Sequence, residues 1–225
     1  MTPEPANLDS PANVDSPLEN PADEGMDQWV TQMRQGDSGA LGEVFAAYQE
    51  RLRGIIRFRL DYRLAGRFSE SDVLQETYIA AATRLKHFGD QPDMPAFLWL
   101  RLLATQQMID LQRKHLKAEK RDVRREISIQ QPQSDAQTSL CIAARLVGDQ
   151  TGVSQLIQKA EQIAKLEEVL NTMDAIDREV IALRHFEELS NIETARVLQI
   201  DPSAASKRYV RAMARLAELI VPNDK

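Results

Sequence analysis

Six polar and cationic side chains near the C-terminal end of the sequence are of the types that bind DNA. They lie on or beside one face of a helix predicted over residues 202–216, a stretch that contains no acidic residue. Arginine and lysine neutralise phosphates, while small polar side chains reach base edges in the major groove. The pattern favours a DNA-reading helix, and the alternative is one arm of a solvated helical hairpin. The six residues are Ser203, Ser206, Lys207, Arg208, Arg211 and Arg215.

Two short helices joined by a tight turn are predicted to hold this face in position. In the first helix, Ile192, Ala195 and Leu198 follow the spacing of a buried helical stripe. The stripe breaks at residues 199–201, where Ile200 is expected to fill the angle between the two helices. Gln199 stands where such turns often carry glycine, because glycine accepts a positive φ without strain.

The second helix has a clear N-terminal signature. Asp201 is a good N-cap residue, and Pro202 suits the first helical position, where no backbone N–H is needed. The inward stripe of this helix is predicted to be Ala205, Tyr209, Ala212 and Leu216. Together the two helices match a helix-turn-helix, in which the second helix enters the major groove.

A second surface is predicted on a helical segment over residues 69–88. Its buried stripe is predicted to be Leu74, Tyr78, Ala81, Leu85 and Phe88. The opposite face carries Asp72, Gln75, Glu76, Ile79 and Thr83. An acidic and amide patch around one exposed isoleucine indicates a docking surface for another protein. We exclude acid–base catalysis, and predict no enzyme, because no nearby histidine, nucleophile or glycine loop accompanies the carboxylates.

A long helix predicted over residues 96–126 changes character midway. Residues 97–103 are apolar on nearly all sides, which predicts a buried central helix, whereas the sequence from Arg113 onward is strongly basic. Such a helix presents its charged end to an anionic partner. The alternative is a solvated helix end, because the helix macrodipole favours cations near the C-terminus in any case.

The chain of 225 residues has the composition of a soluble, charged protein. It has no apolar run near the roughly 20 residues that span a bilayer and no signal-peptide pattern, so we expect a cytoplasmic protein without membrane insertion. A single cysteine, Cys141, excludes an internal disulfide, and with only three histidines no metal site is expected. No cofactor or small-molecule substrate is predicted. Few aromatic residues and almost no strand-like alternation favour an all-α fold.

The net charge of −6 is unevenly distributed along the chain. Residues 1–28 contain seven acidic residues and no lysine or arginine, so the remainder is slightly basic. We predict a disordered acidic leader over residues 1–25, which is either inert or masks the basic surfaces. A helical domain over 26–126 follows, then a flexible linker over 127–161 with a short helix around 141–147. A second helical domain over 162–221 ends in the helix-turn-helix.

Four stretches of the sequence, in this order, resemble those of a known protein family. They are GDSGALGEVFAAYQERLRGII at residues 36–56, DVLQETY at 72–78, WLRLLATQQMIDLQRK at 99–114, and the run from LEEVLNTMDAIDREVIALRHFEELS into the final helix pair. The chain resembles the sigma-70 family of bacterial RNA polymerase sigma factors, in its short extracytoplasmic-function (ECF) type. The resemblance covers most of residues 27–220 and implies a protein that directs core RNA polymerase to promoters.

The resemblance also implies a role for each surface. Asp72, Gln75, Glu76 and Ile79 would dock on the clamp helices of the beta-prime subunit. The loop over residues 87–95 would hold a flipped base of the minus-ten box, which needs an apolar or aromatic pocket and nearby cations. The residues beside that DNA would be Gln106, where the family often has asparagine, and Asp110, Arg113, Lys114 and Lys117. The minus-thirty-five box would be read by Ser203, Ser206, Lys207, Arg208, Arg211 and Arg215.

Two other classes of function are open to this sequence. A stand-alone helix-turn-helix regulator would need a dimerisation or ligand-sensing element, and the first domain shows neither a heptad seam nor a ligand-pocket pattern. A helical adaptor without a DNA role would explain the face around Ile79 but not the cations of the last helix. We therefore predict a sigma factor whose partners are core RNA polymerase (beta-prime and beta subunits) and promoter DNA. The sequence leaves open whether an anti-sigma factor is another partner.

Overall fold

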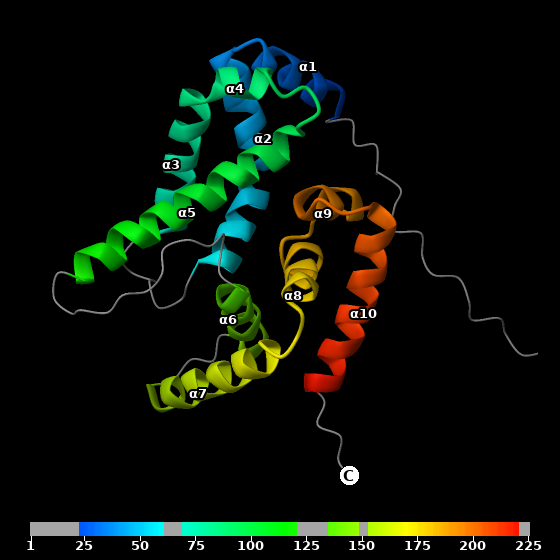
Figure 1. Ribbon diagram of the computed structural model, residues 1–225. Helices are drawn as coiled ribbons and strands as arrows, with labels where there is room; N and C mark the ends of the chain where they lie inside the picture. Colours follow the sequence, from blue (N-terminus) through cyan, green and yellow to red (C-terminus); the bar gives the residue numbers. More distant parts are fainter. Residues whose placement is uncertain (1–22, 61–68, 121–134, 149–152, 221–225) are drawn as a thin grey trace, which may run out of the picture.

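Every regular element that the structure describes is a helix (Figure 1). This computed structural model describes residues 23–60, 69–120, 135–148 and 153–220, and the predicted all-α fold is confirmed. None of the described helices is both long and apolar enough to cross a lipid bilayer. Most of the predicted acidic leader lies outside the described residues, and helix α1 begins at Asp23, earlier than predicted.

The N-terminal half is a bundle built on α2, α3 and α5 (Figure 1). Its helices are α1 (Asp23–Arg34), α2 (Ser38–Arg59), α3 (Glu70–Thr83), α4 (Leu85–Gly89) and α5 (Ala96–Lys120). Leu41 and Leu52 of α2, Val73 of α3 and Leu100 of α5 are fully buried in its core. Each such side chain contributes about 1.5–3 kcal/mol of burial free energy, so the apolar faces of these helices hold the bundle together.

The helix predicted over residues 69–88 is two helices. Arg84 has φ −103° and ψ 12°, which ends α3 and lets α4 begin in a new direction. Tyr78 is 37 % exposed and packs edge-on against the Phe45 ring, with 5.2 Å between the ring centroids. It therefore lies at the rim of the core rather than in it. The other residues of the predicted stripe are buried: Leu74, Ala81, Leu85 and Phe88.

The regular elements of the C-terminal half are also helices throughout its described residues. Its elements are α6 (Asp135–Val147), α7 (Val153–Leu170), α8 (Ala175–Ile181), a π-helical turn (Ala182–Phe186), α9 (Asn191–Leu198) and α10 (Pro202–Ile220). The predicted inward stripe of α10 is confirmed, with Tyr209 half-buried and the other three residues buried. The prediction for Ile192 is wrong, because this side chain is 67 % exposed. In such a short helix several residues fit the same spacing, and packing selects Thr194 and Ala195.

Part of the range predicted as a linker is packed helix. α6 begins at Asp135, earlier than the short helix predicted around 141–147, and α7 begins at Val153. α6 packs against α2, α7 and α8, and six consecutive residues of it are buried, from Thr138 to Ala143. Residues 127–134 and 149–152 lie outside the described part of the chain, so a flexible linker there stays a prediction.

The two halves share apolar packing. Leu183 and Leu189 of the C-terminal half belong to the same buried cluster as the core of α2 and α5. Conversely, Phe58 of α2 stacks on Phe186, with 4.8 Å between ring centroids and 4° between ring planes. This packing places α9 close to α2 and to the start of α5 (Figure 1).

The turn between α9 and α10 holds a non-glycine residue in left-handed backbone geometry. Gln199 has φ 54° and ψ 43°, which costs an L-residue about 1–2 kcal/mol. We expect Gln199→Gly to raise the free energy of unfolding by about 1 kcal/mol, the gain being limited by the greater freedom of glycine in the unfolded chain. Urea denaturation of both proteins measures the difference. A loss of stability would contradict the backbone argument and show that the glutamine side chain holds the turn.

Candidate functional site

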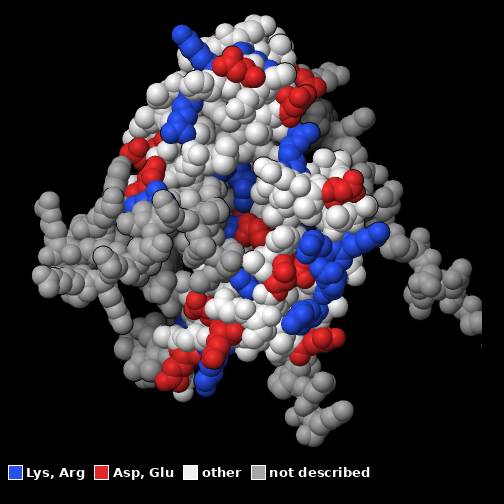
Figure 2. All heavy atoms as spheres, viewed as in Figure 1, with Lys and Arg blue, Asp and Glu red and all other residues white. Residues whose placement is uncertain are grey.

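The predicted DNA-reading face lies on α10 and is open to solvent. Of its six residues, only Arg208 is half-buried and the other five are exposed. Figure 2 shows lysine and arginine side chains gathering over α10. Asp201 caps the helix as predicted, because its Oδ1 accepts a hydrogen bond from the Ser203 backbone N–H at 2.8 Å. Hydrogen bonds from Ser203 hold the pKa of Asp201 below its ordinary value, so the cap is charged at neutral pH.

One buried carboxylate holds two arginines of this face. Asp177 of α8 is 5 % exposed. Its Oδ1 accepts from Nη1 of Arg208 at 3.0 Å and from Nη2 of Arg211 at 3.1 Å, and its Oδ2 lies 3.2 Å from the same Arg211 nitrogen. The contact fixes both guanidinium groups relative to α8. Lys207 and Arg215 are exposed, and one carboxylate leaves the face with a net positive charge.

The predicted polymerase-docking residues share the exposed side of α3. Gln75 and Glu76 are exposed, and Ile79 is 50 % exposed. Asp72 has a structural function as well, since its Oδ2 accepts from the N–H and the Oγ–H of Ser69, at 2.6 Å and 2.8 Å, in a capping box. The hydrogen bonds from Ser69 lower the pKa of Asp72. A change at Asp72 would therefore disturb the start of α3, whereas the other three residues can be changed without loss of a contact to the core.

The residues predicted beside the minus-ten DNA lie along the outer part of α5. Gln106, Asp110 and Arg113 are exposed. Gln106 Oε1 accepts a hydrogen bond from Nη1 of Arg84 at 2.7 Å, which connects α5 to the junction of α3 and α4. Lys114 and Lys117 belong to α5, but the structure does not describe their side chains.

The loop between α4 and α5 covers residues 90–95 and is held by an arginine of α1. It is shorter than the predicted 87–95, because residues 87–89 belong to α4. Arg34 Nη1 donates to the backbone oxygens of Gln91 at 2.8 Å and Phe88 at 3.3 Å, and Nη2 donates to that of Met94 at 2.6 Å. Its guanidinium group also lies 4.3 Å from the centroid of the Phe88 ring. A Cβ on Gly89 would come within 2.5 Å of the Arg34 backbone oxygen, so only glycine permits this approach. Arg34 therefore gives the loop a fixed shape.

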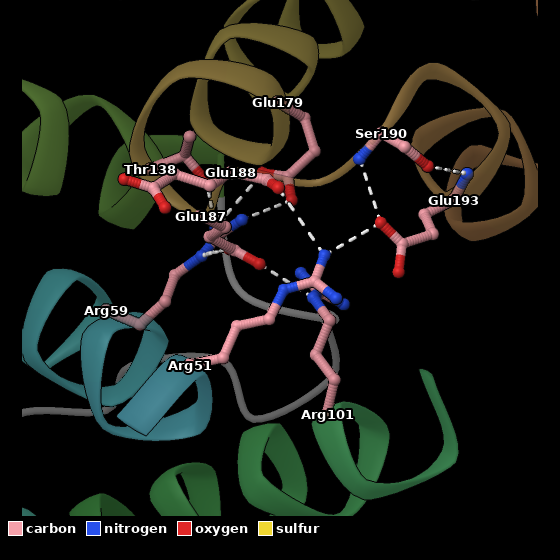
Figure 3. Close-up of polar contacts among 9 residues, drawn as sticks. All are labelled: Arg51, Arg59, Arg101, Thr138, Glu179, Glu187, Glu188, Ser190 and Glu193. Atoms are coloured by element: carbon pink, nitrogen blue, oxygen red, sulfur yellow. Dashed lines mark hydrogen bonds and ion pairs between the residues drawn. The ribbon is translucent and has the colours of Figure 1, made fainter. Parts of the chain in front are cut away.

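A cluster of six charged residues joins the two halves behind these surfaces (Figure 3). We call it the charged cluster. All three arginines come from α2 and α5, and all three glutamates come from the C-terminal half. Its members are Arg51, Arg59, Arg101, Glu179, Glu187 and Glu193.

Glu187 and Arg59 are the centre of the charged cluster. Glu187 is 2 % exposed and accepts from Nε of Arg59 at 2.5 Å and Nε of Arg101 at 2.6 Å. Arg59 is 1 % exposed and also donates to both oxygens of Glu179 and to Thr138 Oγ1. Burial by itself would lower the pKa of Arg59, but the nearby carboxylates outweigh it and raise the pKa. Every buried charge here thus has an opposite partner, as burial requires.

Arg51 forms the outer part of the charged cluster. Its Nη2 lies 2.8 Å from Glu193 Oε2, and its guanidinium group stacks 3.6 Å from the centroid of the Phe97 ring. Glu193 also accepts from the Ser190 backbone N–H at 2.8 Å, which closes the capping box of α9. This one carboxylate therefore serves both the start of α9 and the contact between the halves.

The pKa shifts of two glutamates in the charged cluster predict an acid limit to stability. Burial raises the pKa of Glu179 and Glu193, but hydrogen bonds and charges from Arg59 and Arg51 outweigh it and hold each pKa below 4.5. A folded-state pKa below the unfolded one stabilises the folded protein above the unfolded pKa. We expect the melting temperature to be level near neutral pH and to fall as the pH drops below about 4.5. A Glu179→Gln/Glu193→Gln variant should show a shallower fall, and an identical profile would contradict the assignment.

The charged cluster contains functional candidates that sequence reasoning missed. Arg101 gave a usable signal, because a charge inside a run that is apolar on nearly all sides must be buried and needs an acidic partner. That partner, Glu187, is 86 positions away, beyond the reach of local spacing. Arg59 is one of five arginines over residues 51–63, and local spacing does not distinguish it as a buried one. Within the described part of the chain, no group of His, Cys, Asp and Glu could hold a metal ion.

The chain is similar to known proteins along both halves. A family model described as ECF sigma factor matches residues 23–220. The chain is 30 % identical over 149 residues to the RNA polymerase sigma factor CnrH of Cupriavidus metallidurans, covering 66 % of this chain and 72 % of that protein. It is 25 % identical over 188 residues to the ECF RNA polymerase sigma factor SigW of Bacillus subtilis, covering 83 % and 92 %. A solved structure of CnrH in complex with the cytosolic domain of CnrY matches at 26 % identity and a TM-score of 0.48, over 86 % of this chain and 95 % of that one.

Proposed function

The chain belongs to the ECF sigma factor family, and from this premise we propose how its surfaces divide the work of a sigma factor. As a sigma factor it binds core RNA polymerase and directs it to promoters. The observation that carries the division is that one chain exposes both the α3 surface around Ile79 and the cationic face of α10. A stand-alone regulator would need only the second of these surfaces.

Docking to core polymerase is assigned to the exposed side of α3. A half-exposed isoleucine surrounded by polar residues has the composition of a protein interface, with an apolar centre and a polar rim. Gln75 and Glu76 supply the rim, and the family resemblance points to the clamp helices of the beta-prime subunit as the partner. The assignment is supported by the absence of any core packing role for Gln75, Glu76 and Ile79 among the described contacts.

Minus-ten recognition is assigned to the 90–95 loop and the outer part of α5. A loop that captures a base binds best when it is already ordered, because ordering on binding costs affinity. The three carbonyl contacts of Arg34 provide that order. Exposed Arg113 is in a position to neutralise phosphates of the displaced strand.

Minus-thirty-five recognition is assigned to α10, and two of its cations are expected to behave differently. Lys207 lies in the early turns of the helix, which contact base edges in this motif, so Lys207→Ala should cost about 1–3 kcal/mol and relax the preference at one base pair. Arg215 lies further along, where phosphates are contacted, so Arg215→Ala should weaken binding to all sequences alike. It should also reduce the slope of log K against log salt concentration by about one.

Holoenzyme binding to a set of single-base promoter variants, repeated at several salt concentrations, measures both effects. Glu218→Ala, at another exposed position of α10, is the control for loss of a side chain. Equal, sequence-independent losses for Lys207→Ala and Arg215→Ala would contradict the assignment of base reading to Lys207.

Promoter affinity in this proposal depends on connecting two weak DNA readers on one polymerase. The second reader then binds at a high effective concentration, so the free chain should bind duplex promoter weakly. The protein acts by binding, without catalysis of its own, and works in the cytoplasm beside polymerase and chromosome. Co-elution of the chain with core polymerase on gel filtration tests the proposal, and failure to form a complex would contradict it.

A further inference from the structure

An acidic side chain lies beside the cationic face of α10, where a negative charge would repel DNA. Asp177 of α8 is 5 % exposed, and its carboxylate contacts both Arg208 and Arg211. Because like charges brought together across an interface lower affinity, this carboxylate weakens the attraction of the face for phosphates. A negative charge stabilises the start of a helix, but the N-cap residue Asp174 already supplies one to α8. The particular effect of Asp177 is therefore on the two arginines that it contacts.

Asp177 binds each arginine through one nitrogen only. Its Oδ1 accepts from Nη1 of Arg208 at 3.0 Å and from Nη2 of Arg211 at 3.1 Å. A guanidinium group has five N–H donors on three nitrogens, and no contact among the described residues uses the other two nitrogens of either arginine. The Arg211 side chain is 64 % exposed and that of Arg208 is 32 % exposed. Each guanidinium group is thus anchored at one edge and open to a ligand at another.

The two arginines flank the line of α10 that would meet base edges. Ser203, Lys207 and Val210 are exposed and follow helical spacing along the side of α10 opposite its buried stripe. Arg208 and Arg211 lie beside this line, toward α8, since both reach the carboxylate on that helix. When such a line lies in the major groove, cations at its flank meet the phosphates of one groove wall. These cations hold the helix in place without reading sequence.

A fixed arginine and a free arginine differ in what they add to specificity. A free arginine can reach several neighbouring phosphates, so it supports binding in many registers and adds affinity for every sequence. An arginine that is held in one orientation meets a phosphate in one register and loses less side-chain freedom on binding. The base-reading side chains then face the same base pairs each time. Holding the arginines therefore raises the affinity for the correct sequence relative to all others.

We propose that Asp177 is a positioning residue for the minus-thirty-five contact, and that it sets the sequence preference by holding Arg208 and Arg211 in one orientation. Asp177 acts through these arginines and is too deeply buried to contact DNA itself. The inference rests on the proposed function, because the orientation matters only if α10 binds promoter DNA. It predicts that removal of one buried charge increases binding to the wrong sequences.

Asp177→Asn tests the proposal, because asparagine keeps the shape of the side chain and removes its charge. Holoenzyme with the full-length chain is bound to a promoter fragment mapped by run-off transcription, and to the same fragment with its minus-thirty-five box scrambled, at several salt concentrations. We expect the affinity for the scrambled fragment to rise about three- to tenfold and its salt slope to steepen by about one, because a freed arginine neutralises one more phosphate. The affinity for the intact promoter should not rise, so the sequence preference falls.

Asp174→Asn is the matched control for this substitution. It removes a charge from the start of the same helix, where Asp174 is exposed and accepts from the Ile176 backbone N–H. Asparagine is an equally good N-cap residue, so the sequence preference and the salt slope should stay unchanged. Urea denaturation shows whether each variant is folded under the binding conditions.

A second comparison does not depend on the folding of the Asp177 variant. Arg211 and Arg215 are both exposed and lie about one turn apart on α10, and among the described contacts Asp177 holds the first and not the second. Arg211→Ala should therefore weaken binding to the intact promoter at least about fivefold more than binding to the scrambled fragment. Arg215→Ala should weaken both alike.

Two results would overturn the inference and leave the proposed function intact. One is an Asp177→Asn variant that is less stable but has the sequence preference of the control, which would make Asp177 a structural residue only. The other is an equal loss on the two fragments for Arg211→Ala. If holoenzyme with the unmodified chain does not distinguish the intact from the scrambled fragment, the assignment of α10 fails, and the inference fails with it.

Discussion

Glu187→Gln is expected to lower the free energy of unfolding by about 3–5 kcal/mol, because it removes one partner from a buried ion-pair cluster. The Glu187 carboxylate is 2 % exposed and contacts Arg59 and Arg101 through its two oxygens. Glutamine keeps the size of the side chain but not its charge, so two buried guanidinium groups lose their shared counter-charge. In the described structure, the only acidic partner then left to these two arginines is Glu179, which contacts Arg59. Urea denaturation followed by circular dichroism measures the loss.

The neighbouring residue provides a matched control for this substitution. Glu188 has the same side chain but is exposed, so Glu188→Gln should change stability by no more than about 0.5 kcal/mol. A domain of this kind has about 5–15 kcal/mol of total stability, which makes the two expectations easy to separate. Equal losses from both substitutions would show that burial of the charge at Glu187 is not what matters.

Gln75→Ala combined with Ile79→Asp is expected to reduce the affinity for core polymerase by roughly 100-fold or more, with folding intact. The substitution places a charge where the proposal buries an apolar side chain, which costs several kcal/mol unless the charge is paired. Folding should be preserved because Ile79 is 50 % exposed and neither residue contacts the described core. Titration of labelled protein with core polymerase measures the affinity.

Leu146→Asp is the control for the docking variant. Leu146 is a 40 % exposed apolar residue of α6, away from α3 in the structure (Figure 1). Its replacement by aspartate should leave the affinity for core polymerase close to that of the unmodified chain. If the docking variant binds as tightly as this control, polymerase contacts the protein elsewhere and the assignment of α3 is wrong.

The parts of the structure that follow from local chemistry were predictable from the sequence. Asp201 and Pro202 define the start of α10 by capping and by the conformation of proline, and both effects act within a few residues. The exposed side of α3 follows from helical periodicity in the same way. These features needed no knowledge of the rest of the chain.

The parts that depend on distant partners were not predictable. Residues 128–139, where α6 begins, resemble a linker because they are rich in Gln, Ser and Thr, yet Thr138 is buried and its hydroxyl bonds to Glu179. Arg59 is buried because Glu187 lies 128 positions away in the chain and close in space. Arg34, the last residue of α1, holds the 90–95 loop by donating to the backbone oxygen of Gln91, 57 positions further along the chain. Local spacing contains no information on any of these contacts.

The central claim, that this chain is a sigma factor with two promoter readers, is tested most directly by run-off transcription. The purified protein is added to bacterial core polymerase with a genomic fragment library, and the new 5′ ends are sequenced. We predict discrete, factor-dependent start sites preceded by a shared pair of sequence boxes, and loss of these starts with Gln75→Ala/Ile79→Asp. An absence of factor-dependent starts, together with no co-migration with core polymerase, would contradict the claim.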